Sequence, residues 1–222
     1  MADINWKSSA KRRALSVFEE LKILYPVVES ALISSNPFEK LAATILSAQC
    51  TDARVNMVTP ELFKKYPDPA SMAGAELLDI ETIIHSTGFY HAKAAHLKGM
   101  AEMIIEKFEG TVPAEIDKLI QLPGVARKTA NCVLNDCFGI ASGIVVDTHV
   151  ARLALRFGFS KGPKNNAVKI ENDLMAIFKK DTWIELSHLF IYHGRTICHS
   201  RKPQCPECTL KNLCFEYNNN NK

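Results

Sequence analysis

The chain has 222 residues, and its 27 Lys and Arg against 24 Asp and Glu give a formal charge of +3 at pH 7. Hydrophobic residues make up 47% and charged residues 23% of the chain. This composition is typical of one or two globular domains and excludes a disordered chain of low hydrophobicity. The small positive surplus permits a nucleic-acid partner only if the basic residues cluster.

The pattern predicts neither a membrane span nor an export signal. A spanning helix needs about 18 apolar residues in a row, and the longest comparable run is the short segment Gly139–Val146. The N-terminus carries a basic cluster, but an amphipathic pattern with Glu19 and Glu20 follows it where an exported protein would have an apolar stretch. We therefore expect a cytoplasmic protein with no membrane contact.

Apolar residues recur at helical spacing along most of the chain, without the sustained period-two alternation of strands. The apolar stripes lie at residues 14–21, 38–45, 55–62, 77–84, 97–105, 116–120, 130–137 and 150–157. Breakers separate them, among them Pro26, Pro37, Pro60, Pro123 and Gly158. The pattern predicts an all-α fold of about ten short helices, with a domain hinge near Gly139–Val146.

The segment Leu122–Ala130 joins two of the predicted helices. Pro123 ends the first helix and Gly124 permits a sharp reversal, so the amides that begin the second helix point outward at the positive end of its dipole. Such a helix start binds phosphate without reading bases, and Arg127 and Lys128 add to the attraction. An ordinary helical hairpin is the alternative.

Lys128 and Asp147 are the candidates for chemistry. An amine that attacks a nucleotide must be uncharged, and a position at a helix N-terminus lowers the cost of losing the proton. The alternative for Lys128 is a solvated cation on a phosphate. Asp147 precedes the stripe that begins at Val150, where it is either a helix cap worth about 1 kcal/mol or a carboxylate whose second oxygen faces a pocket.

Cysteines crowd near the C-terminal end of the chain. In a reducing compartment such a group is more typical of metal binding than of disulfides. Zinc is the usual ion for four cysteines, but zinc ribbons pair two short knuckles and only one is present here. Arg201 and Lys202 lie within the group, where ligation would fix them at the surface for phosphate contact. The four are Cys198, Cys205, Cys208 and Cys214, whereas Cys50, Cys132 and Cys137 are predicted to be small buried side chains.

Together these strings resemble the endonuclease III family, a branch of the helix-hairpin-helix DNA glycosylases that carry iron-sulfur clusters. The resemblance rests on the hairpin with Lys128, on the Val-Asp-Thr-His string around Asp147, and on the cysteine spacing x6, x2, x5, and it covers the chain from about Leu15 to Cys214. It implies an all-α helix-hairpin-helix glycosylase fold with two helical domains and a DNA-binding groove between them. Residues 30–140 would form the central domain, and residues 1–29 plus 141–222 the iron-sulfur domain.

The resemblance implies a bifunctional DNA glycosylase and AP lyase in base excision repair. The enzyme would excise oxidised pyrimidines from duplex DNA and cleave the abasic strand by β-elimination. Lys128 would be the nucleophile, Asp147 its electrostatic and proton-transfer partner, and the four cysteines the ligands of a [4Fe-4S] cluster. The partner would be double-stranded DNA with damaged pyrimidines or abasic sites, bound at the nucleoid by a monomer.

The resemblance also implies a set of DNA contacts. The turns at Gln49 and Phe89 are similar to two loops that penetrate the duplex, although from pattern alone Gln49 would end a helix and Phe89 would belong to the core. Ala126 stands where the family usually has glycine, and Phe89 where leucine is more common. His91 and Lys93 fall where further contacts are expected. The implied DNA-binding set is Gln49, Phe89, Tyr90, Gly124, Val125, Ala126, Arg127, Thr129, His149, Arg201 and Lys202.

Two other functions share part of these features. An adenine mismatch glycosylase of the same superfamily would lack the lysine at Lys128 and would usually carry a further domain after Cys214. A non-catalytic iron-sulfur DNA-binding protein would need the hairpin and the cysteines, but neither Lys128 nor Asp147.

Overall fold

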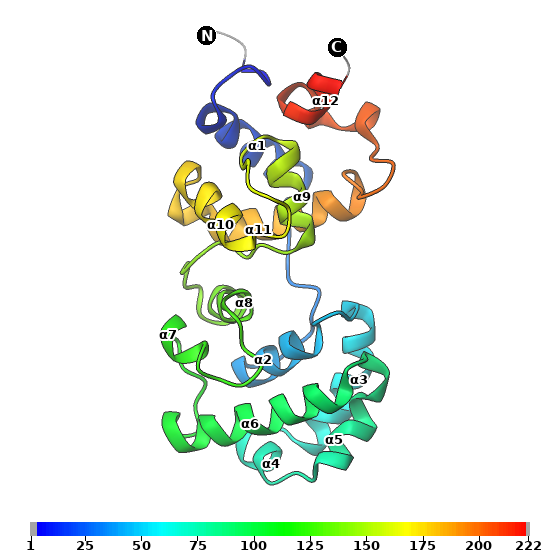
Figure 1. Ribbon diagram of the computed structural model, residues 1–222, viewed down its shortest axis with the longest axis vertical. Coiled ribbons are helices and arrows are strands. Elements are labelled where there is room, and N and C mark those ends of the chain that lie inside the picture. The colour runs from blue at the N-terminus through cyan, green and yellow to red at the C-terminus, as the bar shows by residue number, and fades with distance from the viewer. Residues whose placement is uncertain (1–3, 221–222) are drawn as a thin grey trace. The chain divides into compact units, whose positions relative to one another are not determined.

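The computed structural model describes residues 4–220, and in this range the chain forms twelve α-helices and four short 3-10 helices with no strand. The predicted all-α class is confirmed, with two more α-helices than expected. The chain divides into two compact units, unit 1 (Met1–Glu29 with Gly143–Lys222) and unit 2 (Ser30–Ser142) (Figure 1). That each unit is an independent domain stays a prediction, and the ends of the predicted terminal segments, residues 1–3 and 221–222, lie outside the described residues.

Unit 2 is organised around α6, a helix of 19 residues that packs against α4 and α5, while α8 packs on α2 (Figure 1). Its core is apolar and includes Leu41, Leu62, Leu97 and Ile104. The elements are α2 (Pro37–Leu46), α3 (Asp52–Lys65), α4 (Pro69–Ala73), α5 (Leu77–Ile84), η1 (His85–Thr87), α6 (Tyr90–Phe108), α7 (Ile116–Leu119) and α8 (Arg127–Phe138).

Capping residues set the starts of these helices. The side chain of Asn36 accepts a bond from the Glu39 amide at the start of α2, and Thr51 accepts one from the Arg54 amide at the start of α3. Pro60 was expected to separate two helices, but it lies inside α3. The proline removes one backbone bond, and the helix continues because the buried side chains on both sides of it, Val55, Val58 and Leu62, hold one apolar face.

A buried ion pair joins α2 to α8. Lys40 Nζ lies 2.9 Å from Asp136 Oδ2, and both side chains are almost inaccessible to solvent. Cys132, one turn before Asp136, lies beside this pair, and burial raises the pKa of its thiol to about 12. The pair fixes the register of α8, which carries Lys128 in its first turn.

Unit 1 gathers the N-terminal helix and the C-terminal third of the chain around a second core. Arg13 is buried, and its guanidinium donates to the carbonyls of Phe157 and Leu213, so that α1 is bonded to both segments. The elements are α1 (Ala10–Leu24), α9 (Thr148–Arg156), α10 (Ala167–Ile177), η2 (Lys180–Thr182), α11 (Trp183–Thr196), η3 (Cys205–Glu207), η4 (Thr209–Leu213) and α12 (Phe215–Asn220).

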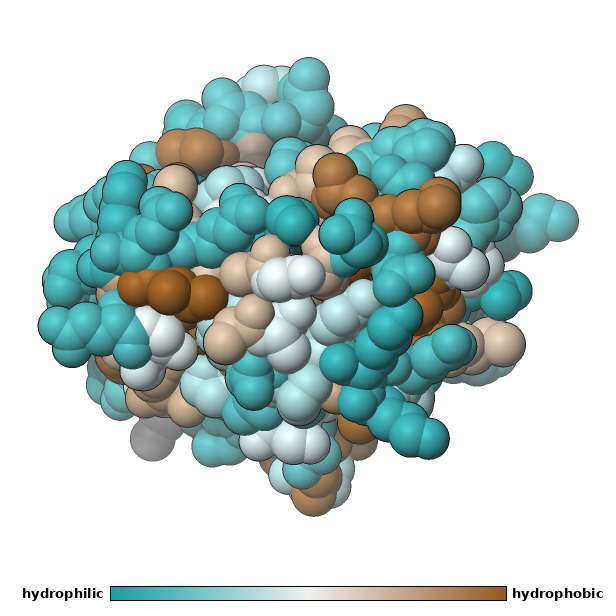
Figure 2. Space-filling model, turned by 90° about the horizontal axis from the view of Figure 1, so that it is seen from below, coloured by the Kyte–Doolittle hydropathy of each residue, from teal (hydrophilic) through white to brown (hydrophobic). Residues whose placement is uncertain are grey.

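The surface carries scattered apolar side chains. Figure 2 shows one face on which hydrophilic residues prevail and hydrophobic residues form separate small patches. Within residues 4–220, none of the helices combines the length and the apolar character that crossing a bilayer requires.

Candidate functional site

The hairpin between α7 and α8 depends on a glycine. Gly124 has φ of +76°, and a Cβ added there would lie 2.9 Å from the ring and Cβ of His96. Both the left-handed backbone and the close side chain therefore require glycine at this turn. Ala126 has φ of −84° and ψ of 167°, a conformation open to any L residue, so the alanine fits the backbone here.

The hairpin presents the start of α8 with no side chain capping it. Ala126 is the N-cap residue and makes no side-chain bond. Lys128 and Arg127 are exposed in the first turn and Thr129 is half-buried, while the side chain of Val125 is buried and its amide donates to the Leu122 carbonyl. This helix start therefore combines outward amide donors with two cations, the arrangement that favours an anion.

Asp147 caps α9 in unit 1. Its Oδ1 accepts bonds from the amides of His149 and Val150, each at 2.8 Å. Neither bond uses Oδ2, so one carboxylate can cap the helix with one oxygen and present the other. His149 is half-buried, burial lowers its pKa, and its Nδ1 lies 3.0 Å from Arg152 Nη2.

Two residues of unit 2 with exposed side chains have a left-handed backbone conformation. Gln49 has φ of 53° and Phe89 has φ of 50°, values that cost a non-glycine residue about 1–2 kcal/mol. Phe89 is 66% exposed, so the core position expected from pattern alone is wrong: the turn at Gly88-Phe89 keeps the ring outside the core. Tyr90 is half-buried, with its ring centroid 4.4 Å from that of His85.

Lys93 lies where the resemblance implied a further DNA contact, but its side chain is buried. Its side chain is 4% exposed, and Nζ donates to the carbonyl oxygens of Leu46 at 2.8 Å and Thr87 at 2.9 Å. A side chain buried in this way cannot contact DNA directly. The expectation was wrong because α6 turns this position into unit 2, whereas its neighbour His91 is exposed.

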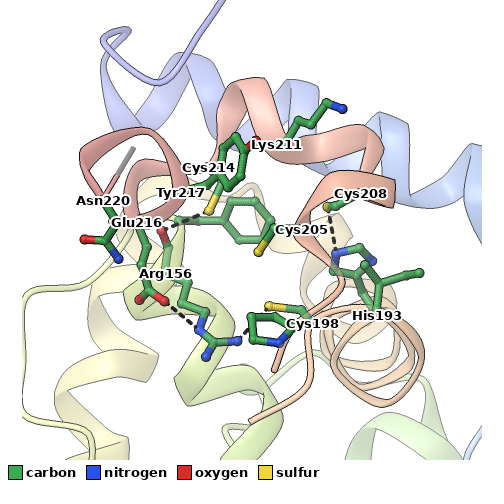
Figure 3. Close-up of a pocket in the computed structure, with 13 residues that line it drawn as sticks. Arg156, His193, Cys198, Cys205, Cys208, Lys211, Cys214, Glu216, Tyr217 and Asn220 are labelled. Atoms are coloured by element: carbon green, nitrogen blue, oxygen red, sulfur yellow. Dashed lines mark hydrogen bonds and ion pairs between the residues drawn. The ribbon is translucent and has the colours of Figure 1, made fainter. Parts of the chain in front are cut away.

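All four C-terminal cysteines line one cavity in unit 1, of about 280 Å³ (Figure 3). None of the seven cysteines forms a disulfide. Burial raises the pKa of the Cys214 thiol to about 11 and also raises the pKa values of Cys205 and Cys208. Among residues 4–220 there is no group of three or more His, Cys, Asp and Glu placed to hold a single metal ion.

Arginines of α9 hold the segment that carries the cysteines. Arg152 Nε donates to the Cys198 carbonyl at 3.0 Å, and Arg156 Nη1 donates to Cys198 Sγ at 3.2 Å and to the His199 carbonyl at 2.7 Å. Glu216 completes the ion pair with Arg156 Nε at 3.0 Å (Figure 3). The helix that begins at Asp147 is thus bonded along one face to the cysteine loop.

His193 lies at the wall of the same cavity. It is 1% exposed, and its Nε2 lies 3.5 Å from Cys208 Sγ (Figure 3). Its Nδ1 lies 3.1 Å from the Tyr25 hydroxyl. Burial lowers its pKa to about 4, so the ring is neutral at pH 7. Arg201 and Lys202, by contrast, are exposed on the loop between Cys198 and Cys205.

Sequence reasoning did not single out Arg152, Arg156 or the buried role of Lys93. Arginines at this spacing on an amphipathic helix are typical of a solvated face, so the pattern gave no sign that Arg152 and Arg156 bind the cysteine segment. For Lys93 the signal was the apolar spacing of its neighbours Ala94 and Leu97, which places it near the buried stripe of α6.

Comparison with known proteins agrees with this geometry. The model of the HhH-GPD superfamily base excision DNA repair proteins matches residues 42–180. Endonuclease III of Synechocystis sp. is 48% identical over 93% of this chain and 94% of its own length, and endonuclease III of Bacillus subtilis is 42% identical over 87% of each. The chain belongs to the endonuclease III family. Endonuclease III of Escherichia coli K12 is 36% identical over 92% of this chain and 95% of its own.

Solved structures of endonuclease III share the fold. A trapped covalent intermediate of endonuclease III with DNA has a TM-score of 0.90 at 39% identity and covers 97% of this chain and 100% of that one. A non-covalent endonuclease III–DNA complex has a TM-score of 0.89 at 40% identity and covers 96% of this chain and 99% of that one. The helix-hairpin-helix glycosylase fold predicted from the sequence is confirmed.

The two glycines that flank α8 allow a matched test of the hairpin. Gly124→Ala should lower the free energy of unfolding by about 2–4 kcal/mol, from a left-handed alanine and from the clash with His96. Gly139 also has positive φ, but no atom lies within 4 Å of an added Cβ, so Gly139→Ala should cost only about 1 kcal/mol. Urea denaturation measures both, and equal losses would contradict the role of His96.

Proposed function

We propose that the chain is a bifunctional DNA glycosylase and AP lyase that removes oxidised pyrimidines from double-stranded DNA in base excision repair, acting as a monomer on the nucleoid. The observation that supports it most is Lys128, an exposed lysine in the first turn of the hairpin helix α8 in a chain of the endonuclease III family. An adenine mismatch glycosylase would lack this lysine, and a non-catalytic DNA-binding protein would not need it.

Base loss is the first step of the proposed reaction. As the bond between C1′ and the base breaks, positive charge develops on the sugar, and the base leaves with the bonding electrons and takes up a proton. The Asp147 carboxylate stabilises that charge with the oxygen that does not cap α9. The hydrogen bonds from the backbone amides of His149 and Val150 to the other oxygen hold this carboxylate in place.

Covalent attack by Lys128 connects base loss to strand cleavage. Its neutral amine forms a bond to C1′, and the C1′–O4′ bond then breaks as a proton passes from nitrogen to O4′, which leaves a protonated imine. The imine makes the 2′ hydrogen acidic, so a base removes it and the C3′–O bond breaks with departure of the 3′ phosphate. The solved relative described as a trapped covalent intermediate with DNA supports a covalent step of this kind.

Extrusion of the damaged nucleotide needs side chains that fill the vacancy. Gln49 and Phe89 are exposed on fixed turns of unit 2, and an aromatic ring such as that of Phe89 can stack against the bases it separates. Tyr90 contributes to the same surface. Opposite-base preference then depends on Phe89.

The phosphate backbone contacts are proposed on both units. On the hairpin, the amides of Gly124 and Ala126, together with Arg127 and Thr129, would bind phosphate at the start of α8, while Val125, whose amide donates to the Leu122 carbonyl, supports the turn. On unit 1, His149, Arg201 and Lys202 supply further contacts. These contacts position the duplex without reading its sequence.

A [4Fe-4S] cluster fits the cavity lined by Cys198, Cys205, Cys208 and Cys214. A single zinc ion holds sulfur at about 2.3 Å, which leaves little space among its ligands, whereas the cavity that these four cysteines line together with other residues has a volume of about 280 Å³. Metal binding requires deprotonated thiols, and the guanidinium of Arg156, 3.2 Å from Cys198 Sγ, favours the thiolate there. When bound, the cluster supplies four iron–thiolate bonds that fix the loop carrying Arg201 and Lys202.

Metal analysis tests the cofactor. Purified protein should be brown, with about four iron and four acid-labile sulfide per chain. Cys208→Ser should lose much of this iron, while Cys137→Ser, a cysteine of unit 2, should keep it. Colourless protein with one zinc per chain would contradict the proposal.

Replacement of Lys128 tests the nucleophile. Lys128→Ala should abolish strand cleavage and the borohydride-trapped adduct with an abasic duplex, because no amine remains in the first turn of α8 to form the imine. Lys118→Ala, which removes an exposed lysine of α7 paired with Glu115, is the control and should trap normally. A persistent adduct in Lys128→Ala would show that another amine attacks.

Replacement of Asp147 separates its charge from its capping role. Asp147→Asn keeps an oxygen for the amides of His149 and Val150, so it should fold with little loss of stability. Base excision should fall about 10²-fold or more because the charge is gone. Asp68→Asn, at the cap of α4, is the control and should excise normally. Normal excision by Asp147→Asn would mean that the carboxylate is only a cap.

A further inference from the structure

Two loops that carry proposed DNA contacts approach one buried side chain of unit 2. The first follows the end of α2 at Leu46 and contains Gln49; the second follows η1 at Thr87 and contains Phe89. Each of these two residues has the left-handed conformation, which persists in a non-glycine residue only where the surroundings determine it. The structure therefore needs a feature that holds both turns.

Lys93 is bonded to both loops. From the first turn of α6 it donates to the carbonyl of Leu46, three residues before Gln49, and to the carbonyl of Thr87, two residues before Phe89. Both carbonyls stand at the C-terminal ends of helical segments, where carbonyls lack helical partners and the dipole is negative. An ammonium group satisfies both at once.

Burying the ammonium group of Lys93 costs free energy, and a role in packing alone does not explain why a charged side chain stands here. An ammonium group is expensive to bury, and here its bonding partners are two neutral carbonyls. An apolar side chain of similar length would fill the same space without this cost, but it would leave the two carbonyls without the bond that joins the loops. What the cation adds is the connection between Leu46 and Thr87.

We propose that Lys93 is a positioning residue that holds the Gln49 loop and the Phe89 loop at a fixed separation, so that both side chains enter the duplex together. This inference rests on the proposed function, because it assumes that these loops open the duplex. Lys93 itself touches neither DNA nor the reacting atoms. It acts through the two carbonyls, and loss of its charge should impair base extrusion more than binding.

The test measures base extrusion without chemistry. All variants are made in the Lys128→Ala chain, and the probe is a duplex with 2-aminopurine opposite an oxidised thymine, whose fluorescence rises when the stack opens. Lys93→Met should lower the extrusion equilibrium about tenfold or more, as expected when a positioning contact is lost, with affinity for undamaged duplex nearly unchanged. Lys98→Met is the matched control, since Lys98 also lies on α6 and donates to one carbonyl, that of Ala75, which belongs to neither loop.

A double-mutant cycle separates positioning from general support. If Lys93 acts through the loops, Lys93→Met should have little further effect once Phe89→Ala has removed the wedge, whereas a purely structural role would give additive losses. Additive losses, or equal behaviour of Lys93→Met and Lys98→Met, overturn the proposal. If Lys93→Met fails to fold, Lys93→Gln, which keeps an amide donor without the charge, takes its place in the same cycle.

The same experiment distinguishes this inference from the function beneath it. If the Lys128→Ala parent gives no fluorescence change with the damaged duplex, the proposed function fails, and this inference fails with it. If the parent responds and Lys93→Met responds equally, only the role of Lys93 is overturned.

Discussion

The reversal at Gly124 is the constraint on which the hairpin depends. His96 occupies the space that a side chain would need, and the backbone is left-handed. Any residue other than glycine would therefore be strained at this turn. The turn ends directly in α8, whose first-turn amides have no side-chain cap, and Lys128 stands among them. The Lys40–Asp136 pair then fixes α8 on α2, and through it the first turn is tied to the core of unit 2.

In unit 1 the cysteine segment has little regular structure of its own, so contacts with the helices must hold it in place. Between α11 and α12 the chain forms only two short 3-10 helices in the described range. Arg152 and Arg156 bond this segment to α9, and Arg13 bonds its end to α1. The four sulfurs therefore face one cavity before any iron is considered, which agrees with a cofactor that completes a loop already held by arginines.

The sequence predicted local features better than distant contacts. Helical periodicity located most helices, because apolar spacing reflects burial directly, but it missed that α3 continues through Pro60. The cap position of Asp147 followed from its place before an apolar stripe. The burial of Lys93, the exposure of Phe89 and the arginine bonds to Cys198 depend on residues distant in sequence or on a left-handed turn, and neither leaves a periodic signal. The resemblance indicated that Phe89 contacts DNA, whereas the apolar pattern alone placed Phe89 in the core.

The proposed reaction requires that one amine, that of Lys128, forms a covalent bond with the sugar of an abasic site. The most direct measurement is to trap the wild-type protein on an abasic duplex with borohydride, digest the adduct with a protease, and locate the modified residue by mass spectrometry. The sugar remnant should be attached to the Nζ of Lys128. Attachment to any other lysine or to the N-terminal amine would contradict the proposed reaction.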